Sequence, residues 1–467
     1  MTKRTKNIIL TIVGIQLIIA IGLLALPTMV QALPGRYRVA LQERYPAVGQ
    51  ATEWVIQQVA PVATALPAPS QVNSSNVDIA ALINEPTTQE TAVPTATPQP
   101  TATPKAQPPA TTQEQTTPEP TATPLPSPTP IPTPTPLPER VILEGMGSVR
   151  QSFNNCGPAN LTQVLNWYGY DITQEAIASY LKPNSEDRNV SPWQIADYVN
   201  EQTFNEFRAI TRSNGTLELI KRFIAAGYPV VIEKGYTLPE SGWYGHYLTV
   251  YGYDDNLQEF YSRDTYLGPF DGSGRVDSYD VYREQWQAFN YTFYIVYRPE
   301  QEAEVMDILG PDMTDDFTMW QQAAARAEKD TKADPNNPFA WFNLGTALTR
   351  MGAITGDHDY YQGGAQAFDR AREIGLPPRM LWYQFEAYLA YWRTERLQDV
   401  LDLADATLAT QGGRNVEETY LYKGHALSEL GRLTEAREAY QEALKVNSNF
   451  YPAQIALDWV NSLLNGG

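Results

Sequence analysis

Cys156 is the only cysteine of the chain, and it stands at the start of a segment with helical periodicity. Apolar side chains recur downstream of it at helical spacing, at Leu161, Val164, Leu165 and Tyr168. Pro158 suits the first turn of such a helix, and Gly169 suits the left-handed position just past its end. A helix N-terminus favours a thiolate, the nucleophilic form of cysteine. Cys156 is therefore a candidate nucleophile, although a single cysteine in a long chain is more often a small buried hydrophobe.

Three further side chains are of the types that a cysteine nucleophile uses. Gln151 precedes Cys156 by five residues, where its amide can donate to an oxyanion beside the backbone N–H of the cysteine. His246 opens an apolar, β-branched and aromatic run that predicts a buried strand, and Asp264 ends the next such run. Two adjacent antiparallel strands would bring this histidine and this carboxylate together.

Asp254 and Asp255 are alternatives to Asp264 as the acid that orients the imidazole. Both follow the histidine strand directly, where Asp and Asn tolerate turn geometry. We therefore expect them to form the turn between the strands, and we assign the orienting role to Asp264. The aromatic loop at residues 234–245 runs into His246, and it either walls a substrate cleft or packs over the sheet edge.

Three motifs of this region resemble the peptidase C39-like family, which are papain-fold cysteine peptidases. They are Gln-x4-Cys-Gly-Pro-Ala at 151–159, Gly-His-Tyr-Leu-Thr-Val-Tyr-Gly-Tyr-Asp-Asp at 245–255 and Asp-x3-Gly at 264–268. The resemblance spans about residues 140–298. The family more often has Asp-Pro where this chain has Asp-Thr, a departure that leaves the carboxylate in place.

The resemblance implies a role for each of the four side chains. Cys156 would be the nucleophile, His246 the general base and acid, Asp264 the group that orients the imidazole, and Gln151 the oxyanion donor.

The order of the expected elements agrees with that family. Helices are predicted after Thr173, after Ser191 and at 217–226, whereas the later segments at 228–233 and 291–297 have the composition of strands. Helices first and strands afterwards is an α+β order. We therefore predict an α+β papain-like cysteine peptidase domain at residues 139–300.

The N-terminus predicts a membrane anchor. Three basic residues among the first six precede residues 8–26, which contain no charged side chain. A helix of that length crosses a bilayer core of about 30 Å, and its basic side stays in the cytoplasm. We predict a single-pass transmembrane helix within residues 1–32, in the cell membrane, with the globular domains outside the cytoplasm. A secretory signal peptide cleaved after Val30-Gln31-Ala32 is the alternative, and either would export the rest.

Two segments separate this anchor from the peptidase domain. Residues 33–60 are a candidate juxtamembrane helical stalk. Residues 61–138 are rich in Pro and Thr and lack the apolar surface that would offset their ordering entropy. We predict a disordered linker that favours extended polyproline II and holds the catalytic domain on the order of 100 Å from the membrane.

Residues 313–467 are predicted to form an all-α domain. Two segments align on Gly345 and Gly424, and each continues into a second helix that carries an aromatic residue, Phe368 or Tyr440. This pattern resembles the tetratricopeptide repeat, a helix pair of about 34 residues. We expect a peptide or protein partner on the concave surface, and we expect the aromatic residues between 382 and 392 to be exposed for binding. A folded spacer is the alternative.

Several classes of function are not indicated. The three histidines, His246, His358 and His425, are far apart and have no partner at a metal-ligand spacing, so no metal site is predicted. There is no phosphate-binding loop, and we expect no cofactor. The formal net charge of -19 argues against nucleic acid, whose backbone repels such a surface.

The sequence therefore predicts an exported, membrane-tethered cysteine peptidase acting on a peptide or protein substrate. One alternative is a papain-fold amidase or transferase that acts on cell-wall or other amides. The other is a non-catalytic adaptor, in which a degenerate peptidase domain and the repeats recruit partners.

Overall fold

The computed structural model describes residues 65–70, 77–84, 136–238, 242–410 and 412–466, together with five isolated positions nearer the N-terminus. Apart from those isolated positions, the predicted membrane helix and the predicted stalk lie outside the described residues. No helix within the described ranges is both long enough and apolar enough to cross a membrane. Residues 65–83 and 137–466 belong to one compact unit.

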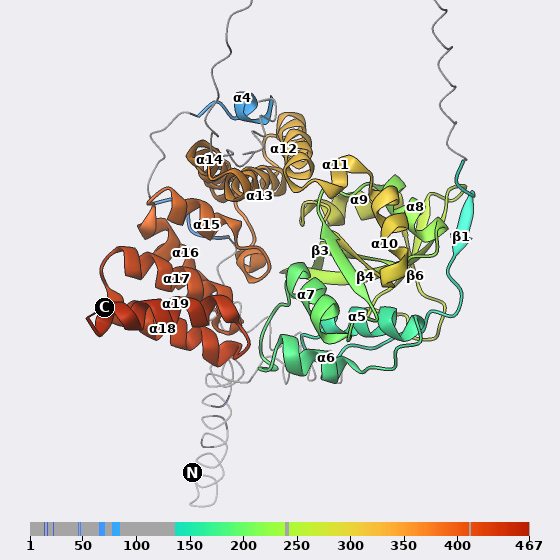
Figure 1. The fold of residues 1–467 in the computed structure, drawn as a ribbon, viewed down its shortest axis with the longest axis horizontal. Helices are drawn as coiled ribbons and strands as arrows, with labels where there is room; N and C mark the ends of the chain where they lie inside the picture. Colours follow the sequence, from blue (N-terminus) through green and yellow to red (C-terminus); the bar gives the residue numbers. More distant parts are fainter. Residues whose placement is uncertain are drawn as a thin grey trace, which may run out of the picture. The chain divides into compact units, whose positions relative to one another are not determined.

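A seven-stranded antiparallel sheet forms the first part of this unit (Figure 1). The strands run in the order β2-β7-β3-β4-β5-β6, and β1 pairs with β4. The aromatic and β-branched residues of β7 and of the second half of β4 are buried, so this sheet must be covered on both faces. The strands are β1 (Arg140–Ile142), β2 (Arg208–Arg212), β3 (Val230–Leu238), β4 (Gly242–Asp254), β5 (Glu259–Arg263), β6 (Arg275–Ser278) and β7 (Phe293–Tyr297).

Helices cover both faces of the sheet (Figure 1). Successive residues of β4 point to opposite faces, so Tyr247 joins the core under α5, α6 and α7, whereas Leu248 joins the core under α8, α9 and α10. The predicted N-caps Thr173 and Ser191 begin α6 and α7. The predicted α+β domain is confirmed. The helices are α5 (Cys156–Trp167), α6 (Gln174–Leu181), α7 (Pro192–Gln202), α8 (Leu217–Ala225), α9 (Tyr279–Gln287) and α10 (Glu302–Leu309).

The described residues that follow the sheet domain are helical, as predicted. The elements are η1 (Pro299–Gln301), α11 (Pro311–Thr314), α12 (Asp316–Ala333), α13 (Pro338–Thr355), α14 (His358–Ile374), η2 (Pro378–Trp382), α15 (Glu386–Arg393), α16 (Leu397–Ala409), η3 (Gly413–Asn415), α17 (Glu417–Glu429), α18 (Leu433–Val446) and α19 (Tyr451–Leu464). Paired helices bury their apolar stripes against each other. We call α11–α19 the helical region.

The aromatic residues between 382 and 392 are mostly buried, so the expectation that they are exposed was wrong. Tyr388 and Tyr391 are 0% exposed, and Trp382 is 8% exposed. They lie in the core shared by α14–α18, because large rings fill the space between neighbouring helices. These aromatic residues therefore stabilise the helical region, and they provide no argument for an exposed binding surface.

Two pieces of the predicted linker are ordered against the helical region. Leu66 is buried in the core that includes α14 and α15, and α4 (Ile79–Asn84) buries Leu82 and Ile83 against α12, α13 and α14 (Figure 1). The prediction of a disordered linker was therefore wrong for these two segments. Composition alone suggested disorder, whereas a few apolar side chains gain enough burial on a preformed helical surface to offset their ordering.

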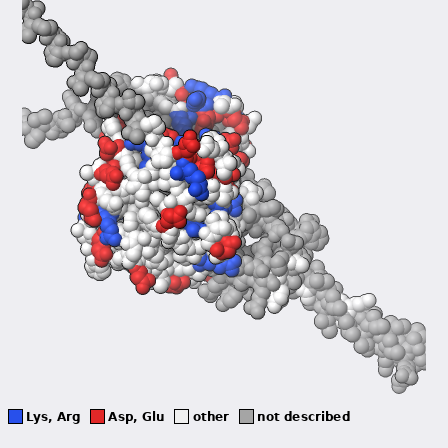
Figure 2. Space-filling view, turned by 90° about the vertical axis from the view of Figure 1, so that its right-hand side faces the viewer, with Lys and Arg blue, Asp and Glu red and all other residues white. Residues whose placement is uncertain are grey.

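The surface of the unit mixes charges of both signs. On the face shown in Figure 2, acidic and basic side chains stand near one another with uncharged residues between them. No large patch of one sign stands out among the described residues on this face.

Buried carboxyls lie where the helical region meets the sheet domain. Asn447 Nδ2 donates to Leu181 O at 3.0 Å and to Glu417 Oε1 at 2.9 Å. Asp187, Glu417 and Glu418 are buried close together, and this burial raises the pKa of all three. Burial therefore disfavours the charged form of each of these acids.

Glu417→Gln is expected to raise the melting temperature at pH 8 and to leave it unchanged at pH 4. The unfolded carboxyl loses its proton above its ordinary pKa of about 4.3. Burial raises the pKa of Glu417 in the folded chain, so the folded carboxyl keeps its proton to a higher pH than the unfolded one, and stability of the unaltered chain falls as pH rises through that interval. An amide does not titrate. A gain of about 1 kcal/mol would appear as a rise of about 1–2 °C in a thermal melt followed by circular dichroism.

The exposed residue Glu438 supplies the control for this prediction. Glu438→Gln should leave the melting temperature unchanged at both pH values. If Glu417→Gln instead lowers the melting temperature at pH 8, Glu417 is an ionised carboxylate in the folded chain.

Candidate active site

Cys156 is the first residue of α5, as the sequence predicted. The next nine residues of the helix are buried, which fixes its N-terminus against the sheet. The loop before it is held by Lys182, whose buried ammonium donates to Asn154 O at 2.8 Å and to Asp187 O at 2.9 Å. The sulfur is thus presented from a rigid helix end rather than from a free loop.

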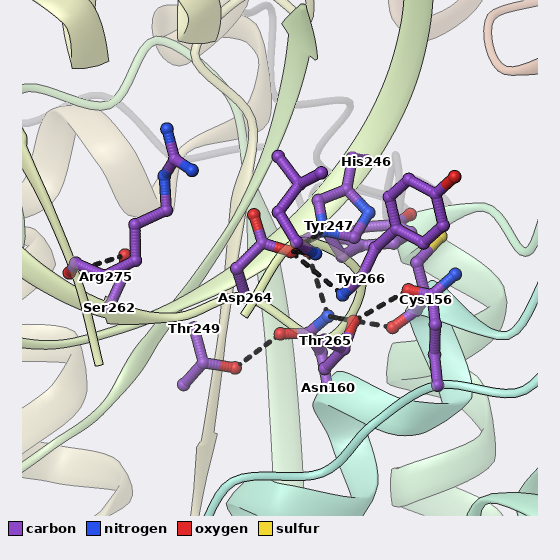
Figure 3. A network of polar contacts seen from close by, with 12 residues as sticks. Cys156, Asn160, His246, Tyr247, Thr249, Ser262, Asp264, Thr265, Tyr266 and Arg275 are labelled. Carbon is purple, nitrogen blue, oxygen red and sulfur yellow. Dashed lines mark hydrogen bonds and ion pairs between the residues drawn. The ribbon is translucent and has the colours of Figure 1, made fainter. Parts of the chain in front are cut away.

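His246 and Asp264 come together from neighbouring strands. His246 lies in β4 and Asp264 directly follows β5, which pairs with β4. His246 Nε2 lies 2.9 Å from Asp264 Oδ1, and both residues are buried (Figure 3). The same oxygen accepts the backbone N–H groups of Tyr266 at 2.9 Å and Leu267 at 2.8 Å. The carboxylate is therefore fixed, and it fixes the imidazole in turn.

The His246 ring lies between Asp264 and Cys156 (Figure 3). Burial favours the neutral imidazole, but the charge of Asp264 and its hydrogen bond, with the contact to Cys156, raise the pKa of His246 to about 9. Burial raises the pKa of the Cys156 thiol, yet the hydrogen bond and charge of His246 outweigh it and lower that pKa overall. Although burial opposes it, the positive charge of His246 holds the pKa of Asp264 well below its usual range. The three groups favour a thiolate beside an imidazolium.

Gln151 lies beside this group and is held by Thr265. Its backbone N–H donates to Thr265 O at 2.8 Å, and Thr265 Oγ1 donates to Gln151 Oε1 at 2.8 Å. Because the amide oxygen accepts this bond, the NH2 end of the side chain is the end oriented to donate elsewhere. Thr265 therefore holds the oxygen end of this amide and leaves its NH2 end to donate, which the predicted oxyanion role requires.

Asn160 connects the remaining parts of the site, and sequence reasoning missed it. Its Nδ2 donates to Cys156 O at 2.9 Å, to Tyr247 O at 3.0 Å and to Thr265 Oγ1 at 3.2 Å (Figure 3). It is fully buried. The signal was a group of polar residues, Asn160, Thr162 and Gln163, among the apolar residues of α5. Thr265 was noted only as a departure from Asp-Pro, although its hydroxyl is what joins Gln151 to this network.

The alternative acids lie elsewhere. Asp254 Oδ1 accepts the backbone N–H groups of Asn256 at 3.0 Å and Leu257 at 3.2 Å, which is a turn. Asp255 accepts from Lys221 and from Tyr279. Neither contacts the imidazole.

Residues 144–294 match the Peptidase_C39 like family. The matched range contains all four predicted site residues and most of the sheet. It supports a C39-like peptidase domain in this part of the chain. No curated protein matches the chain.

Residues 234–245 were expected to form a loop, but most of them belong to the paired strands β3 and β4. Their aromatic side chains pack in two places. Trp243 stacks on Phe289 and Phe339 with ring centroids 5.7 Å and 5.8 Å apart, so it packs the C39-like domain onto the helical region. Tyr236 instead lies beside the catalytic candidate, with its ring centroid 5.8 Å from that of His246.

The helical region also contacts the beginning of β4. Arg379, in η2, donates to Trp243 O at 3.2 Å and lies 4.0 Å from the centroid of the Tyr244 ring. Residue Arg379 of η2 therefore contacts the part of β4 that directly precedes His246. Among the residues described, no cluster of His, Cys, Asp or Glu has the arrangement to hold a metal ion.

Thr265→Val is expected to reduce kcat by about tenfold with little change in KM, measured by steady-state peptide hydrolysis. Valine keeps the volume of threonine but releases the Gln151 amide, so an oxyanion bond worth about 10²–10³ in kcat would be only partly made. In a Gln151→Ala chain, Thr265→Val should not lower kcat any further, because the threonine affects kcat through Gln151.

Thr211→Val in β2, which is far along the sheet from Cys156, is the matched control and should leave kcat unchanged. An equal loss from Thr265→Val with and without Gln151 would mean that the threonine only supports the fold.

Proposed function

We propose that the chain is a cysteine peptidase that hydrolyses peptide bonds through Cys156, His246 and Asp264, with Gln151 as oxyanion donor. One observation supports this proposal most strongly. The His246 imidazole is hydrogen-bonded through Nε2 to the buried Asp264 carboxylate, and it also contacts Cys156, the only cysteine of the chain. A merely structural cysteine does not need a buried, charge-stabilised histidine beside it.

The mechanism is acyl transfer to water. The Cys156 thiolate attacks the scissile carbonyl carbon, forming a C–S bond and placing a negative charge on the carbonyl oxygen. The Gln151 amide and the backbone N–H of Cys156 stabilise that oxyanion. Protonated His246 gives its proton to the leaving amine as the C–N bond breaks. The neutral imidazole then takes a proton from water, which attacks the thioester and releases Cys156.

The cellular setting is part of the proposal. The apolar residues 8–26 after a basic start support export with a single-pass anchor in the cell membrane, the N-terminus in the cytoplasm and the peptidase outside. The Pro- and Thr-rich tract between residue 85 and residue 136 is then the spacer. Substrates would be extracytoplasmic peptides or proteins.

The helical region is proposed to be a tetratricopeptide-type array that binds a peptide or protein partner. Two helix pairs, α13 with α14 and α17 with α18, pack in the same way and support this proposal. A side chain added at Gly345 of α13 would meet the Phe368 ring at 2.8 Å, and one added at Gly424 of α17 would meet the Tyr440 ring at 2.3 Å. In each pair a glycine lets an aromatic ring of the second helix approach the first closely.

Covalent labelling tests the proposed activity. The full-length chain is treated with a peptidyl electrophile that reacts with thiols, between pH 5 and pH 9. Labelling that persists far below the ordinary thiol pKa of about 8.5, and that is lost at acid pH in His246→Ala, supports the ion pair. Labelling that follows the ordinary thiol pKa, unaffected by His246→Ala, would favour a non-catalytic adaptor instead.

A further inference from the structure

Residues 65–70 lie as an extended peptide on the helical region, and helix side chains bind their backbone. Arg372 donates from Nε to Pro67 O at 2.9 Å and from Nη2 to Ala68 O at 3.0 Å. The Ser70 N–H donates to Asp399 Oδ1 at 2.9 Å. At the other end, the Leu66 N–H donates to Leu376 O at 3.0 Å.

The receiving side chains form a buried, charged arrangement. Arg372 Nη1 lies 2.9 Å from Asp399 Oδ1, and both side chains are 1% exposed or less. Arg396 donates to the other oxygen of Asp399 and also binds Asp369. Apolar residues of similar volume would hold helices together as well or better. Two buried charged groups that direct hydrogen bonds at one peptide are instead typical of a binding site.

The peptide sequence fits the hydrogen bonds that this site offers. The site uses the N–H groups of Leu66 and Ser70 and the carbonyls of Pro67 and Ala68. Positions 67 and 69 are prolines, which have no N–H to leave unsatisfied. Prolines also hold the segment extended before it binds, which lowers the entropy cost of binding. The Leu66 side chain is buried and supplies the apolar anchor.

We propose that α14, α15 and α16 form a binding site for extended Leu-Pro-x-Pro-Ser/Thr peptides, which residues 66–70 occupy within the same chain. The chain contains a second copy of the pattern, Leu125-Pro126-Ser127-Pro128-Thr129, in the Pro- and Thr-rich tract. That second segment is therefore an alternative occupant. The proposal identifies the ligand class of the helical region and so rests on its proposed peptide binding, but it does not depend on the cysteine chemistry.

The site is also connected to the strand that carries His246. Leu376, which accepts from the Leu66 N–H, is two residues before η2. Arg379 of η2 contacts the part of β4 that directly precedes His246. Occupation of the site therefore supports the segment that contacts this part of β4.

A peptide-binding measurement tests the proposal. Every full-length chain carries Cys156→Ala, so that it cannot cleave the probe, and Leu125→Asp, so that the second copy of the pattern does not compete. The opened chain also carries Leu66→Asp, which should release the resident segment. A fluorescent peptide of residues 62–72 is expected to bind this chain saturably by anisotropy. The same peptide should bind about tenfold more weakly when Leu66 is intact, because a tethered segment competes at an effective concentration of the order of 1 mM.

Competitor peptides separate specific from general binding. A peptide of residues 122–131 should displace the probe, and the 62–72 peptide with Leu66→Asp should not. Equal binding to the Leu66-intact and Leu66→Asp chains, or no binding to the opened chain, overturns the proposal. Failure of the proposed peptidase activity would leave these results unaffected, since every chain lacks Cys156.

Amide hydrogen exchange keeps the proposal testable if the Leu66→Asp chain does not fold, as judged by circular dichroism. In the chain with Leu66 intact, an excess of the 122–131 peptide should speed exchange of the Leu66 and Ser70 amides at least about tenfold by displacing the resident segment. Unchanged exchange at saturating peptide overturns the proposal.

Discussion

Cys156→Ala is expected to lower peptide hydrolysis by about 10⁴-fold or more, and His246→Ala by a similar factor. The thiolate forms the covalent bond to the substrate, and the imidazolium both stabilises that thiolate and protonates the leaving amine. The measurement is digestion of a diverse peptide mixture by the full-length chain, followed by mass spectrometry. The same cleavage sites should disappear in both variants.

The double variant decides whether the two residues act together. Groups that act as a unit are strongly non-additive, so Cys156→Ala with His246→Ala should be no worse than either change alone. His358→Ala is the matched control, because His358 is exposed on the helical region. Cleavage that survives in Cys156→Ala would exclude this cysteine as the nucleophile, and cleavage lost in His358→Ala would point to a general effect on the chain.

Asp264→Ala is expected to lower kcat by about 10²- to 10⁴-fold and to move the alkaline limb of the pH–rate profile downwards. The limb should lie near pH 9 in the unaltered chain, where His246 loses the proton that it gives to the leaving amine. Removing the carboxylate removes the main interaction that raises this pKa, so the limb should move towards the ordinary histidine value of about 6.5. Steady-state rates between pH 5 and pH 10 measure both effects.

Asp264→Asn separates charge from orientation. Its amide oxygen can still accept from His246 and from the Tyr266 and Leu267 amides, so kcat should recover in part while the alkaline limb stays low. Unchanged kcat and an unmoved limb in Asp264→Ala would show that the imidazole needs no orienting acid. Asp255→Ala, in the turn that follows β4, should leave the profile unchanged.

The proximity of Cys156, His246 and Asp264 could be expected from the sequence, because each lies in or beside a regular element. Cys156 begins α5, His246 lies on β4, and Asp264 directly follows β5, which pairs with β4. Asn160 and Thr265 could not be assigned, since a polar residue in a buried segment indicates only that some partner exists. The partners belong to β4 and to the chain beyond β5, which are far away in sequence.

Two predictions made from composition, the disorder of the whole linker and the exposure of the aromatic residues between 382 and 392, were wrong in the same way. A tract rich in Pro, Thr and Ala predicts disorder because it lacks apolar surface of its own. Leu66, Leu82 and Ile83 are nevertheless buried, because α12, α13 and α14 supply the surface. The aromatic residues between 382 and 392 were expected at the surface and are mostly in the core, since sequence does not say on which side of a helix the next helix will pack.

The sequence by itself determined an α+β domain with the Cys156, His246, Asp264 and Gln151 set, followed by helices. Local spacing, capping residues and turn residues carry that information within single elements. Only the tertiary structure decided that Asn160 donates to Thr265 and Thr265 to Gln151, and that Arg379 of η2 donates to β4. It also decided that Arg372 and Asp399 bind residues 65–70. These contacts join segments that are far apart in sequence, and such contacts depend on how elements pack rather than on any local pattern.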